Sequence, residues 1–205
     1  MPDWFPDWTG HAAAIVASGP STKAKNVDLL RGKVKVIAIK ENVELAPWAD
    51  VLYGCDAPWW INNLGAPKFR GLKITASEML RPHKFDVRTI KVQALDNRMY
   101  FDRSDNIGAG GNSGFQALNL AVAFGAERIA LIGFDCSGAH WYGRNRGPGR
   151  TNPDEWNFRR WRKAFEVSSV ELKDRGFDVV NCSADSTLTC FRKQTVAATL
   201  KEWGL

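Results

Sequence analysis

The chain has 205 residues, of which 44% are hydrophobic and 24% charged. This length and composition suit one globular domain with a sizeable core, and they exclude disorder of the whole chain. The net charge of +6 favours anionic ligands such as nucleotides, nucleic acids or phosphorylated glycans, without distinguishing among them.

The cysteines and the apolar runs exclude several further classes. None of the four cysteines forms a Cys-x-x-Cys pair, so no structural zinc site is predicted. The start Met1-Pro2-Asp3-Trp4 is not that of a signal peptide, and no run of about 18 apolar residues exists. We therefore expect a cytoplasmic protein with free thiols and no membrane span.

The first half of the chain alternates apolar runs with turn residues. Residues 12–17 (AAAIVA) predict a buried strand that runs into Ser18-Gly19-Pro20-Ser21. Residues 23–30 predict a helix stopped by Gly32. Further strands are predicted over 34–39, over 49–54 (closed by Asp56) and, more weakly, over 72–75 and 89–93.

The second half contains the clearest unit. Residues 113–124 are apolar almost all round, which predicts a buried helix that ends at Gly125. Residues 128–132 (RIALI) predict a strand of a parallel sheet, followed by Gly133-Phe134-Asp135.

A long Gly-, Arg- and Pro-rich segment without periodicity covers residues 137–151 and is interpreted as a lid or active-site loop. The next helix is expected to have Asn152 as its N-cap and Pro153 in its first turn, and to end at Gly176. A last strand over 177–181 and a closing helix over 194–203 complete the chain.

Alternating strands and helices with short connections predict one α/β domain over residues 1–205. Its sheet is expected to be doubly wound and mostly parallel, with helices on both faces, as in Rossmann-like folds. Such sheets bind ligands beyond the carboxyl ends of their strands, near the point where the strand order reverses. Small or polar residues follow several of the predicted strands, including Glu41, Asn42, Asp56, Asp135 and Ser183.

Two glycine-containing loops are the main candidates for ligand binding. One is Ser18-Gly19-Pro20-Ser21, and the other is residues 108–114, which include Gly110, Gly111, Asn112, Ser113 and Gly114. Glycines let the backbone approach a phosphate, and the start of the following helix offers N–H groups. The alternative is a glycine-rich turn without a ligand. Neither loop matches a Walker A motif or a dinucleotide fingerprint.

Three features could carry chemistry beyond binding. Asp135 at a strand end could accept hydrogen bonds from a ribose or bind a metal, or merely cap loop amides. His140 could act as a general base or be incidental. The basic residues after it form either a phosphate clamp or a solvated helix face: Arg144, Arg146, Arg150, Arg159, Arg160, Arg162 and Lys163.

Four separated motifs occur in the order found in a known superfamily. They are Ala14–Ser21 (AIVASGPS), Ala49–Asp56 (ADVLYGCD), Asn112-Ser113-Gly114 with Gly125–Asp135 (GAERIALIGFD), and Asn181–Leu188 (NCSADSTL). The chain resembles bacterial lipooligosaccharide sialyltransferases and the MptE-like family of archaeal 6-hydroxymethylpterin diphosphokinases. Its C-terminal part, with His140-Trp141-Tyr142-Gly143, is most similar to bacteriophage proteins of this superfamily.

The resemblance implies roles for individual residues. Those implied to hold the nucleotide and its sugar are Ser18, Gly19, Pro20, Ser21, Asn42, Asp56, Gly110, Gly111, Asn112, Ser113, Gly114 and Ser183. His140 is implied as the general base, beside Asp135. Tyr142, Arg144 or Arg146 would stabilise the departing phosphate.

Three functions follow as hypotheses. The first is a glycosyltransferase that uses a nucleotide sugar without a required metal, with a hydroxymethylated DNA base or a surface glycan as acceptor. The second is a diphosphokinase or nucleotidyl transferase that uses ATP and Mg²⁺, for which Asp56 and Asp135 are the obvious carboxylates. The third is a non-catalytic phage protein that binds nucleotides or nucleic acid.

Overall fold

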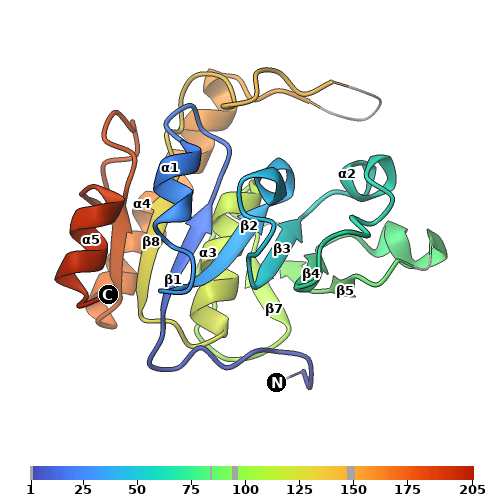
Figure 1. The fold of residues 1–205 in the computed structure, drawn as a ribbon, viewed down its shortest axis with the longest axis horizontal. Helices are drawn as coiled ribbons and strands as arrows, with labels where there is room; N and C mark the ends of the chain where they lie inside the picture. The colour runs from blue at the N-terminus through green and yellow to red at the C-terminus, as the bar shows by residue number, and fades with distance from the viewer. Residues whose placement is uncertain (1, 84, 94–96, 147–150) are drawn as a thin grey trace.

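The chain forms one large parallel sheet. The computed structural model describes residues 2–83, 85–93, 97–146 and 151–205. Eight strands lie in the order β10-β9-β8-β1-β2-β3-β4-β5, and every neighbouring pair is parallel (Figure 1). The strands are β1 (Ala12–Val16), β2 (Lys35–Ile39), β3 (Val51–Gly54), β4 (Leu72–Thr75), β5 (Arg88–Thr89), β8 (Arg128–Ile132), β9 (Asp178–Asn181) and β10 (Arg192–Lys193).

Strand β1 is at the centre and is buried along its whole length. It pairs on one side with β2 and on the other with β8, which lies more than a hundred residues further along the chain. The order therefore reverses between β1 and β8, as the doubly wound α/β prediction requires. A small separate sheet pairs β6 (Lys91–Gln93) with β7 (Asn106–Gly108).

Alternation along β1 sends side chains into two cores, one on each face of the sheet. Ala13 and Ile15 belong to the core that contains α3 (Ser113–Ala123) and α4 (Glu155–Asp174). Ala14 and Val16 belong to the core on the other face. The helices that contribute to that second core are α1 (Ala24–Asp28), α2 (Ala57–Asn62) and α5 (Val196–Glu202).

Helix α3 is the helix buried most completely, as its sequence predicts. Its residues from Phe115 to Ala123 are all buried, including the polar Gln116 and Asn119. Each amide has partners: Gln116 accepts from the Tyr53 hydroxyl at 2.8 Å, and Asn119 accepts from the backbone N–H of Gly108 at 2.9 Å. These bonds fix α3 and the loop before it relative to β3.

The structure corrects several predicted boundaries. The N-cap of α4 is Asp154 rather than Asn152, because Asp154 and Asn157 exchange side-chain and backbone hydrogen bonds in a capping box. The strand expected over 89–93 is two strands in the structure: Thr89 is the last residue of β5, and residues 91–93 form β6. Helix α2, the 3₁₀ helices η1 (Lys40–Glu44) and η2 (Glu78–His83), and strands β7 and β10 were not predicted.

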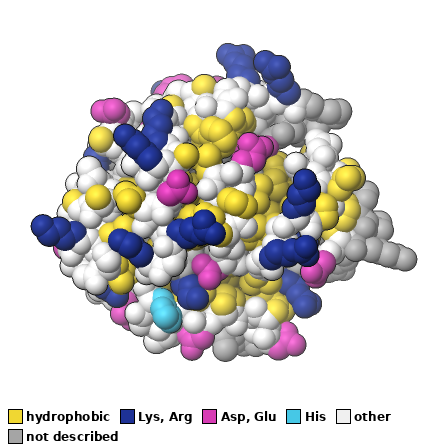
Figure 2. All heavy atoms as spheres, viewed as in Figure 1, with side chains coloured by type: hydrophobic (Ala, Val, Ile, Leu, Met, Phe, Trp, Pro, Cys, Tyr) yellow, Lys and Arg dark blue, Asp and Glu magenta, His cyan; other side chains and the backbone are white. Residues whose placement is uncertain are grey.

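Charged side chains are spread over the surface. Figure 2 shows Lys and Arg side chains interspersed with Asp and Glu on the face viewed there, rather than collected in one patch. Among the described residues, no helix is both long and apolar enough to cross a membrane.

Candidate functional site

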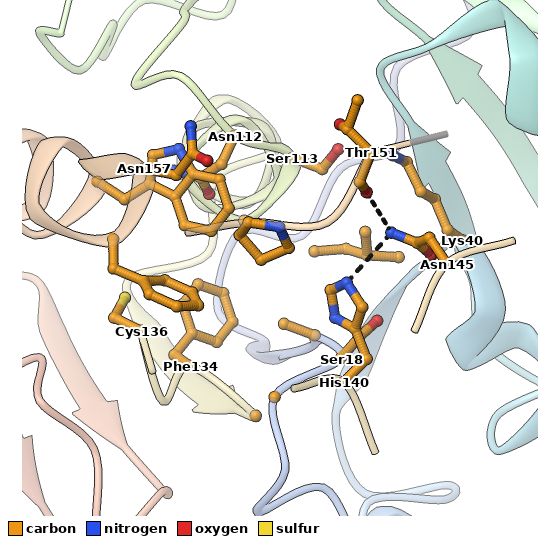
Figure 3. A pocket seen from close by; sticks show the side chains of 18 of the residues that line it. Ser18, Lys40, Asn112, Ser113, Phe134, Cys136, His140, Asn145, Thr151 and Asn157 are labelled. Atoms are coloured by element: carbon orange, nitrogen blue, oxygen red, sulfur yellow. Dashed lines mark hydrogen bonds between the residues drawn. The ribbon is translucent and has the colours of Figure 1, made fainter. Parts of the chain in front are cut away.

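A cleft opens at the carboxyl ends of the central strands, at the upper edge of the sheet in Figure 1. It lies where the strand order reverses, the position at which open α/β sheets bind ligands. The segments that line it come from the ends of β1, β2, β3 and β8, the loop before α3, the loop after β8 and the first half of α4 (Figure 3). Both glycine-containing loops singled out in the sequence contribute to this one cleft.

The first loop is packed directly against the end of β8. The backbone N–H of Gly19 donates to the carbonyl of Gly133 at 2.9 Å. A Cβ on Gly19 would overlap both that carbonyl and the carboxylate of Asp135, so this position has no room for a side chain. Ser18 and Gly19 line the cleft, whereas Pro20 and Ser21 do not.

Asp135 joins the two halves of the sheet. It is 3% exposed, and its carboxylate accepts a hydrogen bond from the Ser21 hydroxyl at 2.8 Å. Burial raises the pKa of Asp135, and the hydrogen bonds from Ser21 oppose part of that shift. Asp135 is not among the residues that line the cleft, so this contact fits a positioning role better than direct contact with a ligand.

The second loop ends in the N-terminus of α3. Gly110 and Gly111 have φ values of 52° and 73°, in the left-handed region that favours glycine. The Asn112 side chain is the N-cap and accepts from the N–H of Phe115 at 2.9 Å. Ser113 and Gly114, the first residues of α3, line the cleft. The first N–H groups of a helix have no acceptor within it, so an anion bound at this end of the cleft would be stabilised by them.

Helix α4 holds this second loop from the other side. The carbonyl of Gly111 accepts the indole N–H of Trp161 at 2.8 Å and the guanidinium of Arg160 at 3.2 Å. The peptide bond between Gly111 and Asn112 is trans, so its carbonyl and its N–H point in opposite directions. Because the Gly111 carbonyl points toward α4, the N–H of Asn112 points away from α4. The sequence placed Arg160 only in a basic cluster and did not indicate this role for either residue.

The loop after β8 is bonded to the end of β2. The indole N–H of Trp141 donates to the Asn42 side chain at 2.9 Å, and the Asn42 amide donates to the Ser18 hydroxyl at 2.8 Å. Asn42 is fully buried behind the cleft, so it positions Ser18 and does not itself reach the cleft. The predicted residues Ser18 and Asn42 are thus brought together, but in different roles.

His140 lies at the mouth of the cleft and is held by two neighbours. Its ring stacks on that of Tyr142, with centroids 5.0 Å apart and planes inclined by 15°. Its Nε2 lies 3.2 Å from the side-chain amide nitrogen of Asn145, which also donates to the carbonyl of Thr151 at 2.7 Å (Figure 3). An amide N–H beside Nε2 favours the neutral imidazole with its proton on Nδ1.

Tyr142 lies beside His140 and closes part of the cleft. Its hydroxyl donates to Glu41 at 3.3 Å, and Glu41 in turn accepts the indole N–H of Trp59 at 2.9 Å. Glu41, Trp59, Tyr142 and Asn145 all line the cleft. The sequence did not predict that Asn145 and Trp59 belong to the site. Trp59 contacts a residue far away in the chain, and the contacts of Asn145 follow no recognisable sequence pattern.

Three further predicted residues, Arg144, Arg146 and Ser183, are not at the cleft surface. Arg144 and Arg146 are exposed and do not line it. Ser183 is completely buried, and its hydroxyl accepts from the N–H groups of Gly133 and Phe134 at 3.0 and 3.1 Å, which fixes the turn after β8. Arg150, also named in the sequence as part of the basic cluster, lies outside the described residues.

A second group of ionisable side chains lies on the β2–β3 side of the cleft. Lys40 forms an ion pair with Asp56, and Cys55 lies beside both, 3.1 Å from the hydroxyl of Ser113. Burial raises the pKa of the Cys55 thiol to about 11, against the opposing charge of Lys40, so this cysteine remains a thiol at neutral pH. All four of the chain's cysteines are free thiols.

Within the described ranges, no group of three or more His, Cys, Asp or Glu side chains is placed to hold a metal ion.

Comparisons with known proteins show the fold of this chain. No protein-family model and no curated protein sequence matches it. Among solved structures it is similar to the sialyltransferase CstII from Campylobacter jejuni, determined in complex with a substrate analogue, CMP-3FNeuAc. The TM-score is 0.55 at 11% sequence identity, over 90% of this chain and 86% of the other. The chain therefore has a sialyltransferase-like α/β fold.

Proposed function

We propose that the cleft binds a nucleotide sugar and that the protein transfers the sugar to an acceptor hydroxyl. The observation that carries this proposal is that both glycine-containing loops line one cleft, at the reversal point of a sialyltransferase-like sheet. The similar structure holds an analogue of a nucleotide sugar, which supports the same ligand class here.

The geometry supports a division of roles within the cleft. The N–H groups at the start of α3 and the Ser113 hydroxyl would stabilise the donor phosphate as negative charge develops on it. The acceptor hydroxyl would lose its proton to His140 and form a bond to the sugar carbon. The bond from that carbon to the phosphate oxygen would break, and the electron pair would leave with the nucleotide.

His140 needs a lone pair for this step. In the neutral ring favoured by Asn145, the lone pair is on Nε2 and faces the Asn145 amide. An acceptor hydroxyl would therefore replace Asn145 at Nε2, while stacking on Tyr142 keeps the ring in place. Asn145 is in this proposal the residue that holds His140 ready in the absence of acceptor.

We further propose a class of acceptor for the sugar and a phage source for the protein. A hydroxymethylated DNA base and a surface glycan both offer a hydroxyl, and the net charge of +6 favours a polyanion such as DNA. A phage source, which the resemblance of the His140-Trp141-Tyr142-Gly143 segment implies, is part of the same proposal.

The decisive experiment is a thermal-shift screen against nucleotides and nucleotide sugars, each with and without Mg²⁺. We expect a nucleotide sugar to raise the melting temperature without metal, and Ser113→Ala to reduce the shift. Ser169→Ala is the matched control, because Ser169 lies on α4 outside the residues that line the cleft, and its hydroxyl donates to the Glu166 carbonyl of the same helix at 2.8 Å. A shift seen with ATP only when Mg²⁺ is present would instead support the diphosphokinase hypothesis. DNA binding without any nucleotide shift would support the non-catalytic one.

Replacement of the proposed base tests the chemistry separately from binding. In His140→Ala we expect transfer to fall about 10²- to 10⁴-fold, the usual contribution of a general base, with little change in donor affinity. Radiolabelled sugar transfer to hydroxymethylated DNA and to glycan acceptors measures the rate, and calorimetry measures the affinity. Full transfer activity in His140→Ala would exclude His140 as the base.

A further inference from the structure

The backbone at Lys40 is strained at the point where β2 enters the cleft. Lys40 directly follows β2 and begins η1, and its φ is 52°. A residue with a side chain rarely adopts this left-handed conformation, and where it persists the surrounding structure enforces it, often at a binding or catalytic site. Glycine or asparagine would adopt the same backbone with less strain, so the choice of lysine at this position needs a reason.

The side chain of Lys40 lies along the cleft wall. It is 24% exposed and forms an ion pair with Asp56, whose side chain is 47% exposed. Figure 3 shows Lys40 on the same side of the cleft as Ser113, opposite Phe134 and Cys136. Cys55 connects the two, because its sulfur lies 3.1 Å from the Ser113 hydroxyl and 2.7 Å from the Asp56 carboxylate. An ammonium group and the N-terminus of α3 therefore lie on one wall.

Lys40 is charged in this position. Burial lowers its pKa, but the negative charges around it, including those of Asp56 and Glu41, outweigh burial and raise it. The other Lys or Arg side chain among the described lining residues is Arg160, whose guanidinium donates to the Gly111 carbonyl. Arg144 and Arg146, the cations expected from the sequence, do not line the cleft.

We propose that Lys40 is the cation that binds the phosphate of the donor nucleotide, and that Asp56 holds its ammonium group in place until the donor arrives. An ammonium has three N–H donors, so it can contact a phosphate oxygen while it keeps a bond to Asp56. This inference rests on the proposed nucleotide-binding function of the cleft. It assigns Asp56 to Lys40 rather than to the ligand.

A purely structural ion pair makes a different prediction from a phosphate-binding lysine. If the pair only joins the loops after β2 and β3, removal of either partner damages the cleft in the same way. If Lys40 binds phosphate, removal of its charge weakens binding, whereas removal of the Asp56 charge takes a repelling anion away from the phosphate and strengthens binding. The two single substitutions therefore have opposite effects only under the proposal.

The test compares nucleotides with their nucleosides. Isothermal titration calorimetry would measure the binding of CMP, UMP, AMP and GMP, and of the four corresponding nucleosides, to the wild type, Lys40→Met and Asp56→Asn. We expect Lys40→Met to weaken the nucleotide that binds best by about tenfold or more, as for loss of a charge-assisted bond, and to leave nucleoside affinity within about twofold. Asp56→Asn should tighten the same nucleotide.

Other outcomes would overturn the proposal. They are nucleotide affinity in Lys40→Met within twofold of the wild type, or equal losses in both variants for nucleotide and nucleoside alike. If the wild type binds none of the four nucleotides, the proposed function fails together with this inference. The two outcomes above overturn the inference alone, so the two kinds of failure can be distinguished. Lys40→Asn is the second variant in case Lys40→Met does not fold, because asparagine removes the charge and tolerates the left-handed backbone.

Discussion

Gly19 is a residue at which the two halves of the sheet lie in close contact beside the cleft. Its Cα lies so near the Gly133 carbonyl and the Asp135 carboxylate that any Cβ would overlap them. The reason for glycine here is contact and not backbone conformation, because Gly19 is not among the glycines with positive φ. The sequence singled out this loop but gave no means of telling these two reasons apart.

We expect Gly19→Ala to destabilise the protein by about 1–3 kcal/mol, as for overpacking of a well-packed site. The Gly133 carbonyl belongs to the backbone at the end of β8, so the strain cannot be relieved by rotation of a side chain. Urea unfolding followed by circular dichroism measures the change. Wild-type stability in Gly19→Ala would show that the loops after β1 and β8 separate easily.

At the scale of secondary-structure elements, α4 fixes the shape of the loop before α3. Trp161 and Arg160 both donate to the Gly111 carbonyl, and Gly111 has no room for a Cβ beside the Arg160 guanidinium. The loop thus keeps its conformation through a helix some fifty residues further along the chain. Such long-range contacts leave no local pattern, which is why sequence analysis found the loop but not the residues that hold it.

Trp161→Phe tests this element directly, since it removes the indole N–H and keeps an aromatic ring. We expect a loss of about 1 kcal/mol in stability, the usual value of one hydrogen bond, together with weaker nucleotide binding. The matched control is Trp156→Phe on the same helix, where the side chain is 64% exposed and its ring stacks on the Arg160 guanidinium, a contact that a phenylalanine ring can keep. Thermal shift with the bound nucleotide compares the two. Equal effects in both variants would contradict the assigned role of Trp161.

The boundaries of α4 show where element prediction is limited. Asn152 and Asp154 are both good N-cap residues, and both precede the helical pattern. The choice falls on Asp154 because Asn157 lies at the right spacing to complete a capping box. Asn152 instead accepts the backbone N–H of Asn145 at 2.7 Å and so helps to fix the loop that carries His140.

At the scale of the whole molecule, one carboxylate in β9 bonds to both of the C-terminal elements, β10 and the end of α5. Asp178 in β9 accepts two hydrogen bonds from Arg192 in β10, at 2.9 and 2.8 Å, and one from the indole of Trp203 just after α5, at 2.8 Å. The hydrogen bond from Arg192 is the largest cause of the lowered pKa of Asp178, and the Trp203 bond adds to it.

This lowered pKa makes stability depend on pH. A carboxylate with a depressed pKa in the fold contributes stability above its unfolded value of 3.8, and that stability is lost as the pH falls through the folded value. We expect Asp178→Asn to cost about 1 kcal/mol at pH 7, because the partly exposed pair is screened by solvent, and much less near pH 3. Urea unfolding at both pH values measures this difference. An equal cost at the two would show that the charge of Asp178 contributes nothing.

Sequence patterning predicted the architecture well where strands are long and apolar. The continuous burial of β1 and β8 follows from AAAIVA and RIALI, and α3 from its apolar circumference. Two- and three-residue strands such as β10 and β7 carry no periodicity and were missed. In the site, glycines and helix starts were visible in the sequence. Lys40 was not, because its importance comes from backbone strain and from Asp56, sixteen residues away.

The hydrogen bonds that build the cleft join residues far apart in the chain. Ser21 and Asp135 are 114 residues apart, and Glu41 and Tyr142 are 101 apart. Contacts that close such long loops carry a large entropic cost and form only after much of the chain has collapsed. We therefore expect the cleft to assemble late during folding and to be lost early during unfolding. A bound donor would accordingly prolong the lifetime of the native state by slowing unfolding, with little effect on the rate at which the chain folds.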